Sequence, residues 1–366
     1  MRIAQVSPLY ESVPPLFYGG TERIVSYLTE ALLQMGHDVT LFASGDSDTA
    51  ARLIPCCRNA LRLDKTCIDS LAHHMLMLEQ VYRLADRFDV IHFHIDYLHF
   101  PLARRYSIPT VSTLHGRLDI PDLVPLYREY ADIPLVSISR SQRKPLPWAN
   151  WQGTVYHGMP ADILPFQPNA GSYLAFLGRV SPEKGVDVAI EVARRSGIKL
   201  KIAAKVDPSD RNYFETAIRP LLDPAVVEYV GEISDEEKTE FLGNALALLF
   251  PINWEEPFGL VMIEAMACGT PVIATRRGSV PEILADGISG YIVDDIEGAV
   301  DAVRCVPLLS RDNCRQEFEK RFLSERMAAE YLAVYRTVAG ARDGQKEDLS
   351  IVHRASSRGV QRAIDA

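Results

Sequence analysis

Short apolar runs alternate with longer amphipathic segments along most of the chain. The run over 2–7 predicts a strand, and apolar residues over 24–32 then recur at the spacing of one helix face. Gly36 is placed to end that helix, and the apolar run over 38–43 predicts the next strand. This alternation is typical of a parallel sheet covered by helices.

The same pattern continues to about residue 338. Further strands are predicted at 90–94, 110–113, 135–138, 154–156, 173–177, 199–203, 226–230, 247–250, 271–274 and 290–293. Helices are predicted at 68–87, 98–106, 122–130, 186–195, 211–222, 235–242, 260–267, 296–303 and 324–338. The chain therefore predicts an α/β protein with strand and helix in repeated succession.

A stretch rich in proline and glycine interrupts the alternation after residue 158, and we interpret 161–171 as a linker. We therefore expect an N-terminal, acceptor-side domain over 1–160 and a C-terminal domain over 172–322. A terminal helix is expected over 323–340, and the polar tail over 341–366 is expected to be loosely ordered. Two doubly wound domains should face each other across a cleft, with ligands at the carboxyl ends of the strands.

Composition narrows the class of protein. The 366 residues carry a net charge of −9, so the basic excess that a nucleic-acid-binding surface needs is absent. Six cysteines lack any C-x-x-C or zinc spacing, which is typical of reduced thiols in a cytosolic protein. No apolar run is long enough to span a bilayer, and the first residues do not resemble a signal peptide. We expect a cytoplasmic protein, with peripheral contact at the inner face of a membrane as an addition.

Glycines follow the first predicted strand. Gly19 and Gly20 directly precede a helix, where backbone N–H groups can approach an anion. A simple tight turn is the alternative. Neither G-x-G-x-x-G nor G-x-x-x-x-G-K-[ST] occurs in the chain, which disfavours an NAD-dependent dehydrogenase and a P-loop enzyme.

Two cations lie at a strand-to-helix corner in G-R-V-S-P-E-K-G. Arg179 ends the predicted strand, and Lys184 immediately precedes the next helix. A guanidinium offers a bidentate fork and an ammonium a point charge, so the pair could bind a diphosphate. Either residue alone is more often a solvated surface cation.

The stretch over 254–282 holds two carboxylates, Glu256 and Glu264. Pro257 suits the first turn of a helix, and the residues after it would expose free N–H groups. Carboxylates accept hydrogen bonds from sugar and ribose hydroxyls. Two surface glutamates are the alternative, but Glu264 is embedded in apolar residues, where an unpaired charge is costly.

Histidines require separate consideration. His115 ends the predicted strand over 110–113, at the edge that faces the cleft. His92 and His94 share one face of a strand, and H-x-H could indicate a metal, although the sequence places no third ligand. A structural role is favoured for at least one of these two.

A basic and aromatic group of residues follows the strand over 135–138. It comprises Arg140, Arg143, Lys144, Trp148 and Trp151. Such a group could contact a membrane surface or a lipid-linked acceptor. An ordinary solvated loop is the favoured interpretation.

The run E-P-F-G-L-V-M-I-E-A-M-A-C-G-T-P-V-I-A-T resembles the signature of the retaining GT-B glycosyltransferases, glycosyl transferases group 1 (family four). The runs G-R-V-S-P-E-K-G-V and G-G-T-E-R, with the ending F-L-S-E-R-M-A-A-E-Y-L-A-V-Y-R, resemble other blocks of that family, so the resemblance spans about residues 1–340. It implies a GT-B architecture of two Rossmann-like domains. It also implies a nucleotide-sugar bound mainly by the second domain, no required metal, and a terminal helix that crosses back to the first domain.

The resemblance also implies roles for individual residues. Arg179 and Lys184 would hold the donor diphosphate, Glu264 the ribose hydroxyls and Glu256 the transferred sugar. His115 would lie near the transferred sugar and the acceptor, although many relatives have His-Asp where this chain has His-Gly. Further donor contacts are implied at Gly19, Gly20, Gly231, Glu232, Ile233, Phe258, Gly259 and Leu260.

The sequence therefore predicts a retaining hexosyltransferase. It would move a hexosyl unit from a UDP- or GDP-sugar to a hydroxyl of a glycan, lipid-linked or small-molecule acceptor, in polysaccharide, lipopolysaccharide or glycoconjugate synthesis. No cofactor beyond the donor is expected. The motifs position no carboxylate for double displacement, so the resemblance implies attack from the leaving-group face, assisted by the donor phosphate. A non-catalytic nucleotide-sugar-binding protein and a nucleotide-sugar epimerase are the alternatives.

Overall fold

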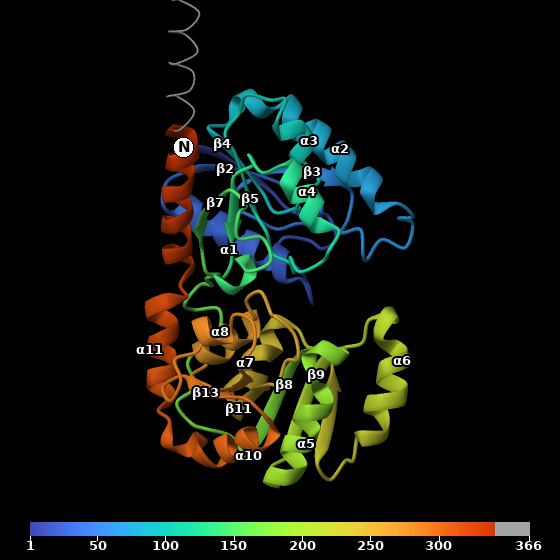
Figure 1. Cartoon of the computed structure of the whole chain (residues 1–366), viewed down its shortest axis with the longest axis vertical. Coiled ribbons are helices and arrows are strands. Elements are labelled where there is room, and N and C mark those ends of the chain that lie inside the picture. The colour runs from blue at the N-terminus through green and yellow to red at the C-terminus, as the bar shows by residue number, and fades with distance from the viewer. Residues whose placement is uncertain (341–366) are drawn as a thin grey trace, which may run out of the picture.

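The computed structural model describes residues 1–340, in which each half of the chain forms one parallel sheet covered by helices (Figure 1). The expected tail over 341–366 lies outside the described residues. The two α/β units lie one above the other along the long axis of the molecule (Figure 1). This arrangement confirms the predicted fold class of two doubly wound domains.

The first sheet has seven strands in the order β3-β2-β1-β4-β5-β6-β7, and all neighbouring strands are parallel. Its central strands are buried on both faces, which explains their nearly continuous apolar runs. The strands are β1 (Arg2–Val6), β2 (Asp38–Ser44), β3 (Arg52–Cys57), β4 (Val90–Phe93), β5 (Thr110–Thr113), β6 (Leu135–Ser137) and β7 (Trp151–Thr154). The helices are α1 (Gly20–Gln34), α2 (Ser70–Arg83), α3 (Phe100–Ala103) and α4 (Leu123–Glu129).

The second sheet has six strands in the order β10-β9-β8-β11-β12-β13, again all parallel. The strands are β8 (Tyr173–Arg179), β9 (Leu200–Lys205), β10 (Val227–Gly231), β11 (Ala245–Phe250), β12 (Val272–Thr275) and β13 (Gly290–Val293). The helices are α5 (Val186–Ser196), α6 (Arg211–Tyr213), α7 (Asp235–Gly243), α8 (Leu260–Ala267), α9 (Val280–Ile283), α10 (Ile296–Cys305) and α11 (Arg311–Arg321).

Several elements differ from the sequence-based expectation. Strand β3 was not predicted, because it is an edge strand that contains Pro55 and is only partly buried. Helix α11 was not predicted either, because most of its residues are polar or charged. The helix predicted over 211–222 is instead a short α6 followed by π and 3-10 turns, and Pro220 lies in the last of these.

The chain returns to the first domain after α11. Helix α11 packs on α8 in the second domain, and the following helix over 324–340 runs beside the first sheet (Figure 1). At the crossing point, the N–H of Met159 donates to the carbonyl of Phe322 at 2.9 Å, and the N–H of Ser324 donates to the carbonyl of Met159 at 3.0 Å. The chain therefore passes between the domains twice at this point, once just before the linker and once just after α11, and the two segments are hydrogen-bonded to each other.

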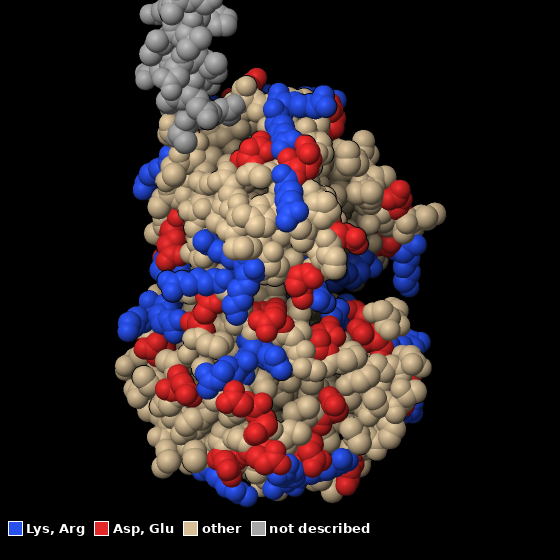
Figure 2. Space-filling view, viewed as in Figure 1, with Lys and Arg blue, Asp and Glu red and all other residues tan. Residues whose placement is uncertain are grey.

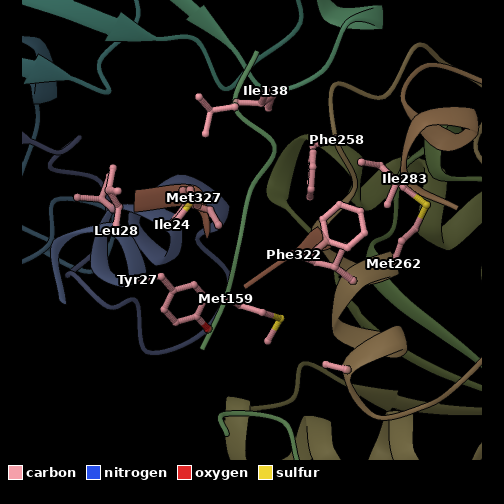
Figure 3. Packing of buried hydrophobic residues seen from close by; sticks show 14 of the residues in the cluster. Ile24, Tyr27, Leu28, Ile138, Met159, Phe258, Met262, Ile283, Phe322 and Met327 are labelled. Carbon is pink, nitrogen blue, oxygen red and sulfur yellow. The ribbon is translucent and has the colours of Figure 1, made fainter. Parts of the chain in front are cut away.

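One apolar cluster spans both domains. Figure 3 shows Tyr27 of α1 and Met159, just before the linker, near Phe258, Met262 and Phe322 of the second domain. All five side chains are buried. Because burial of apolar surface is the main favourable term in folding, this cluster stabilises the contact between the domains as well as each domain separately.

His92, His94 and His99 are among the buried histidines of the first domain. His92 bonds through Nδ1 to the Tyr335 hydroxyl and through Nε2 to Thr113 Oγ1, both at 2.7 Å. The His99 ring stacks on Phe93 with a centroid separation of 3.8 Å. Burial lowers the pKa of His92 and His94 well below the usual value and the pKa of His99 to about 3. These imidazoles are therefore neutral at pH 7.

Neutral buried histidines predict a pH-dependent stability. In the unfolded chain each titrates near 6.5, so below that pH the unfolded state binds more protons than the folded state. Each such histidine lowers the free energy of unfolding by about 1.4 kcal/mol per pH unit as the pH falls from 6.5 toward its folded pKa. Thermal unfolding at pH 7, 6 and 5 should show a falling midpoint. His99→Phe should reduce the number of protons taken up on unfolding by about one, so the unfolding free energy should depend less steeply on pH. An unchanged pH dependence would contradict a neutral, buried His99.

Candidate functional site

The stretch over 254–282 connects β11 to α8, β12 and α9 at the domain boundary. Gly259 precedes α8 with φ of 82°, and a Cβ atom there would lie 2.8 Å from Met262 Cε and 3.0 Å from Phe250 Cζ. Only glycine fits this left-handed, crowded position. The helix begins at Leu260, so the expectation that Pro257 occupies its first turn was wrong.

Glu256 lies in the loop before α8 and is 9% exposed. Its carboxylate forms an ion pair with Lys184 and accepts a hydrogen bond from Trp254 Nε1 at 3.0 Å. The Lys184 ammonium also lies 5.0 Å from the centroid of the Trp254 indole ring. Carboxylate and ammonium therefore compensate each other in a partly dehydrated setting.

Arg179 ends β8 and is surrounded by carboxylates. Its guanidinium lies 2.6 Å from Glu183, 3.6 Å from Asp207 and 3.8 Å from Asp210. The sequence analysis did not anticipate these acidic neighbours. They hold the guanidinium at the carboxyl edge of the second sheet, beside the turn that carries Lys184.

Glu264 lies inside α8 and is 7% exposed. Lys238 of α7 approaches it at 2.8 Å and also pairs with Asp235 at 3.0 Å. Burial alone would raise the pKa of Glu264, but the charges of Lys238 and Arg23 outweigh it and hold the pKa below its ordinary value. Arg23 of α1 forms an ion pair with Asp235, so the network crosses from one domain to the other.

Two helix N-termini meet at the boundary. Helix α1 begins at Gly20 after Gly19, and a Cβ atom on Gly20 would lie 3.5 Å from Leu260 Cδ1 at the start of α8. A Cβ atom on Gly19 would lie 2.7 Å from Pro15 Cβ, so a larger residue would displace the preceding loop. Because helix N-termini carry partial positive charge, this junction suits an anion.

The segment Gly231, Glu232 and Ile233 lies at the end of β10, at the same edge of the sheet. Gly231 has φ of 92°, Glu232 is exposed and Ile233 is buried. The next residue, Ser234, caps α7 through a hydrogen bond to the N–H of Glu237. This segment therefore leads directly into the helix that supplies the lysine bound to Glu264.

His115 follows β5 and lies partly buried in the first domain. Its Nε2 lies 2.9 Å from His94 Nδ1, and burial lowers the pKa of His115 to about 3. The His157 ring stacks on it with a centroid separation of 5.3 Å and an interplanar angle of 17°. His157 in turn lies 4.7 Å from the ring of Phe258.

His157 and Glu282 were missed in the sequence analysis. His157 follows β7 at the same sheet edge as His115, a position that could have been read from the Tyr-His-Gly ending of the strand. The Glu282 carboxylate accepts hydrogen bonds from the N–H of Arg140 at 2.8 Å, the N–H of Ser141 at 2.7 Å and the Tyr156 hydroxyl at 2.9 Å. It thereby connects α9 to the first domain.

The basic and aromatic group after β6 does not form one continuous surface. The Arg143 guanidinium lies over the Trp151 ring at 5.2 Å, and both residues are partly buried. Arg140, Lys144 and Trp148 are exposed. Figure 2 shows basic and acidic side chains side by side along the boundary between the domains.

A cavity of about 280 Å³ opens between the two domains. Its wall includes Arg117 and Gln142 of the first domain and Glu255 and Pro257 of the second. Its wall contains both polar and apolar residues, so it can accommodate a molecule that carries hydroxyl groups on an apolar ring.

Three further observations concern residues 1–340. Within this range no group of three or more His, Cys, Asp or Glu side chains could hold a metal ion, so the H-x-H metal alternative gains no support. All six cysteines are free in the described structure. None of the helices described there is long and apolar enough to cross a membrane.

Family models match both domains. Residues 18–155 match the model described as Glycosyltransferase Family 4, and residues 166–320 match that described as Glycosyl transferases group 1. The two matches divide the chain at the linker between the sheets. Each of the two domains therefore matches a family model of its own.

Individual proteins extend the similarity over most of the chain. Glycogen synthase of Mycobacterium tuberculosis is 28% identical, with 84% of this chain and 86% of the relative covered. Phosphatidyl-myo-inositol mannosyltransferase of Mycolicibacterium smegmatis is 26% identical, with 93% and 95% covered. Anabaena HepE, solved with UDP and glucose, has a TM-score of 0.72 and 15% identity, with 92% of this chain and 100% of HepE covered. By both domains and by its GT-B architecture, the chain belongs to the group 1 glycosyltransferases.

Proposed function

We propose that this glycosyltransferase is a retaining hexosyltransferase that uses a nucleotide-diphosphate sugar, a UDP- or GDP-sugar, as donor. One observation carries the proposal: Lys184, Glu256 and Glu264 lie at a boundary where the N-termini of α1 and α8 also meet. Such a junction offers positive charge for a diphosphate and carboxylates for hydroxyls. The UDP complex of HepE supports the same class of donor.

The proposed donor lies along the carboxyl edge of the second sheet. Arg179 and Lys184 would bind the diphosphate together with the N–H groups at Gly20 and Phe258–Leu260. Glu264 would accept hydrogen bonds from the ribose hydroxyls, and Glu256 from the transferred sugar. Negative charge grows on the leaving diphosphate in the transition state, so preorganised cations and helix N-termini there accelerate the reaction.

Retention is proposed to proceed by attack from the leaving-group face. Glu256 pairs with Lys184 and accepts from Trp254, so its carboxylate is held by two donors and is a weakened nucleophile for double displacement. A phosphate oxygen of the donor would then assist deprotonation of the acceptor hydroxyl. His115 and His157 lie across the boundary from Phe258, where they can contact the sugar or the acceptor.

The acceptor is proposed to be a glycan, a lipid-linked sugar or a small molecule with a free hydroxyl, bound in the cavity lined by Arg117, Gln142 and Glu255. Polysaccharide, lipopolysaccharide or glycoconjugate synthesis is the proposed setting, supported by the glycogen synthase and mannosyltransferase relatives. A cytoplasmic location is supported by the free thiols. Weak peripheral contact with a membrane would involve Arg140, Lys144 and Trp148.

The function is tested by a thermal-shift screen of UDP- and GDP-sugars, followed by product analysis with the best donor. A donor present at 100 times its Kd should stabilise the protein by about 2.7 kcal/mol. The anomeric configuration of the product, read by NMR, should match that of the donor. Binding without transfer or hydrolysis would favour a non-catalytic sensor, a change of sugar without release of nucleotide would favour an epimerase, and an inverted product would refute retention.

Substitution of the proposed diphosphate ligands should reduce turnover. Arg179→Ala and Lys184→Ala are each expected to lower kcat by roughly 100-fold or more, because each removes a preorganised charge from the leaving group. Steady-state nucleotide release measures the effect. Lys199→Ala is the matched control, since Lys199 pairs with Glu228 at 2.9 Å just before β9, at the opposite edge of the sheet. Near-normal rates in both test variants would refute these roles.

Transfer should not require a metal ion. The positive charge that balances the diphosphate would come from Arg179, Lys184 and the two helix N-termini. We therefore expect the rate of transfer to be unchanged after dialysis against EDTA. A loss of activity that added Mg²⁺ or Mn²⁺ restores would show that a metal ion supplies this charge instead.

A further inference from the structure

A line of hydrogen bonds connects the terminal helix to His115 through the interior of the first domain. Gln5 Nε2 donates to the Tyr335 hydroxyl at 3.0 Å. Gln5 Oε1 lies 2.8 Å from His94 Nε2, and His94 Nδ1 lies 2.9 Å from His115 Nε2. Three successive contacts therefore link a residue of the helix over 324–340 to a histidine at the domain boundary.

The strand order explains why these side chains meet. Strands β1, β4 and β5 are neighbours in the sheet, and Gln5 pairs in register with His92. A second branch runs from the Tyr335 hydroxyl to His92 at 2.7 Å, to Thr113 at 2.7 Å and to the Tyr331 hydroxyl at 2.9 Å. Both tyrosines are fully buried, so this network is shielded from water.

The direction of the bonds assigns the proton positions. The Gln5 amide oxygen can only accept, so His94 carries its proton on Nε2 and offers the lone pair of Nδ1. His115 must then donate from Nε2, which leaves its Nδ1 without a proton. Within residues 1–340, neither His115 Nδ1 nor the neighbouring His157 Nδ1 has a hydrogen-bond partner, although both atoms are buried.

We propose that Tyr335 is a positioning residue for His115: through Gln5 and His94 it selects the tautomer whose Nδ1 accepts a hydrogen bond from a substrate hydroxyl. The substrate part rests on the proposed function, whereas the tautomer does not. The same heavy atoms allow the reverse proton pattern if the Gln5 amide is turned over, because the Tyr335 hydroxyl can accept or donate. The reverse pattern would place a proton on His115 Nδ1, a buried N–H without an acceptor within residues 1–340, so the orientation in which Gln5 Nε2 donates to Tyr335 is favoured. Packing of the terminal helix on the first domain therefore sets which nitrogen of His115 carries the proton.

Nitrogen-15 NMR of histidine-labelled protein tests the tautomer directly. We expect the His115 signals, assigned by their loss in His115→Gln, to show a protonated Nε2 and an unprotonated Nδ1. In Tyr335→Phe the amide of Gln5 loses its acceptor, so both tautomers of His115 should be populated. A proton on Nδ1 in the wild type, or an unchanged tautomer in Tyr335→Phe, overturns the proposal.

Kinetics test the substrate part. With the donor found in the screen, Tyr335→Phe should lower kcat for donor cleavage about 10-fold and leave the donor KM unchanged, as is usual for loss of an orienting partner. Tyr82→Phe is the matched control, because Tyr82 is buried in α2 and its hydroxyl has no partner within residues 1–340. Equal kcat in the two variants overturns the positioning role. If the wild type cleaves no nucleotide-sugar, the proposed function fails, while the NMR result still decides the tautomer.

Discussion

The burial of two carboxylates at the domain boundary constrains the rest of the site. An unpaired buried carboxylate costs several kcal/mol, so Glu256 and Glu264 each require a cation. Lys184 comes from the turn after β8 and Lys238 from α7, so the two ion pairs hold these elements against the loop before α8 and against α8 itself. The same pairing keeps ammonium groups at the place where a diphosphate and a ribose are proposed to bind. Structural compensation and donor recognition therefore depend on the same charges.

Contacts across the boundary extend this constraint to the first domain. Arg23 continues the network from Asp235, and Glu282 accepts from two N–H groups after β6. The apolar cluster of Figure 3 also includes residues of both domains, and the terminal helix completes the connection. Separation of the domains would expose this apolar surface and break charged hydrogen bonds.

Histidines give the first domain a different chemistry from the second. The second domain presents charged groups, whereas His94 and His157 are buried, His115 is partly buried, and all three imidazoles are neutral. A neutral imidazole can donate from one nitrogen and accept at the other, so its function depends on which nitrogen carries the proton. The hydrogen-bond network that ends at Tyr335 connects His94 and His115 to the terminal helix. This division of roles suits a reaction in which charge develops on the donor and a proton leaves the acceptor.

The sequence alone determined the two parallel sheets, because strands buried on both faces read as apolar runs separated by amphipathic helices. It also singled out Glu264, since a charge within an apolar helix requires a partner. Only the tertiary structure identified that partner as Lys238 and revealed His157 and Glu282. It also placed β3, an edge strand that contains Pro55, and α11, whose polar composition conceals it. Local patterns record which face of an element is buried, but contacts between residues far apart in the chain depend on strand order and domain packing.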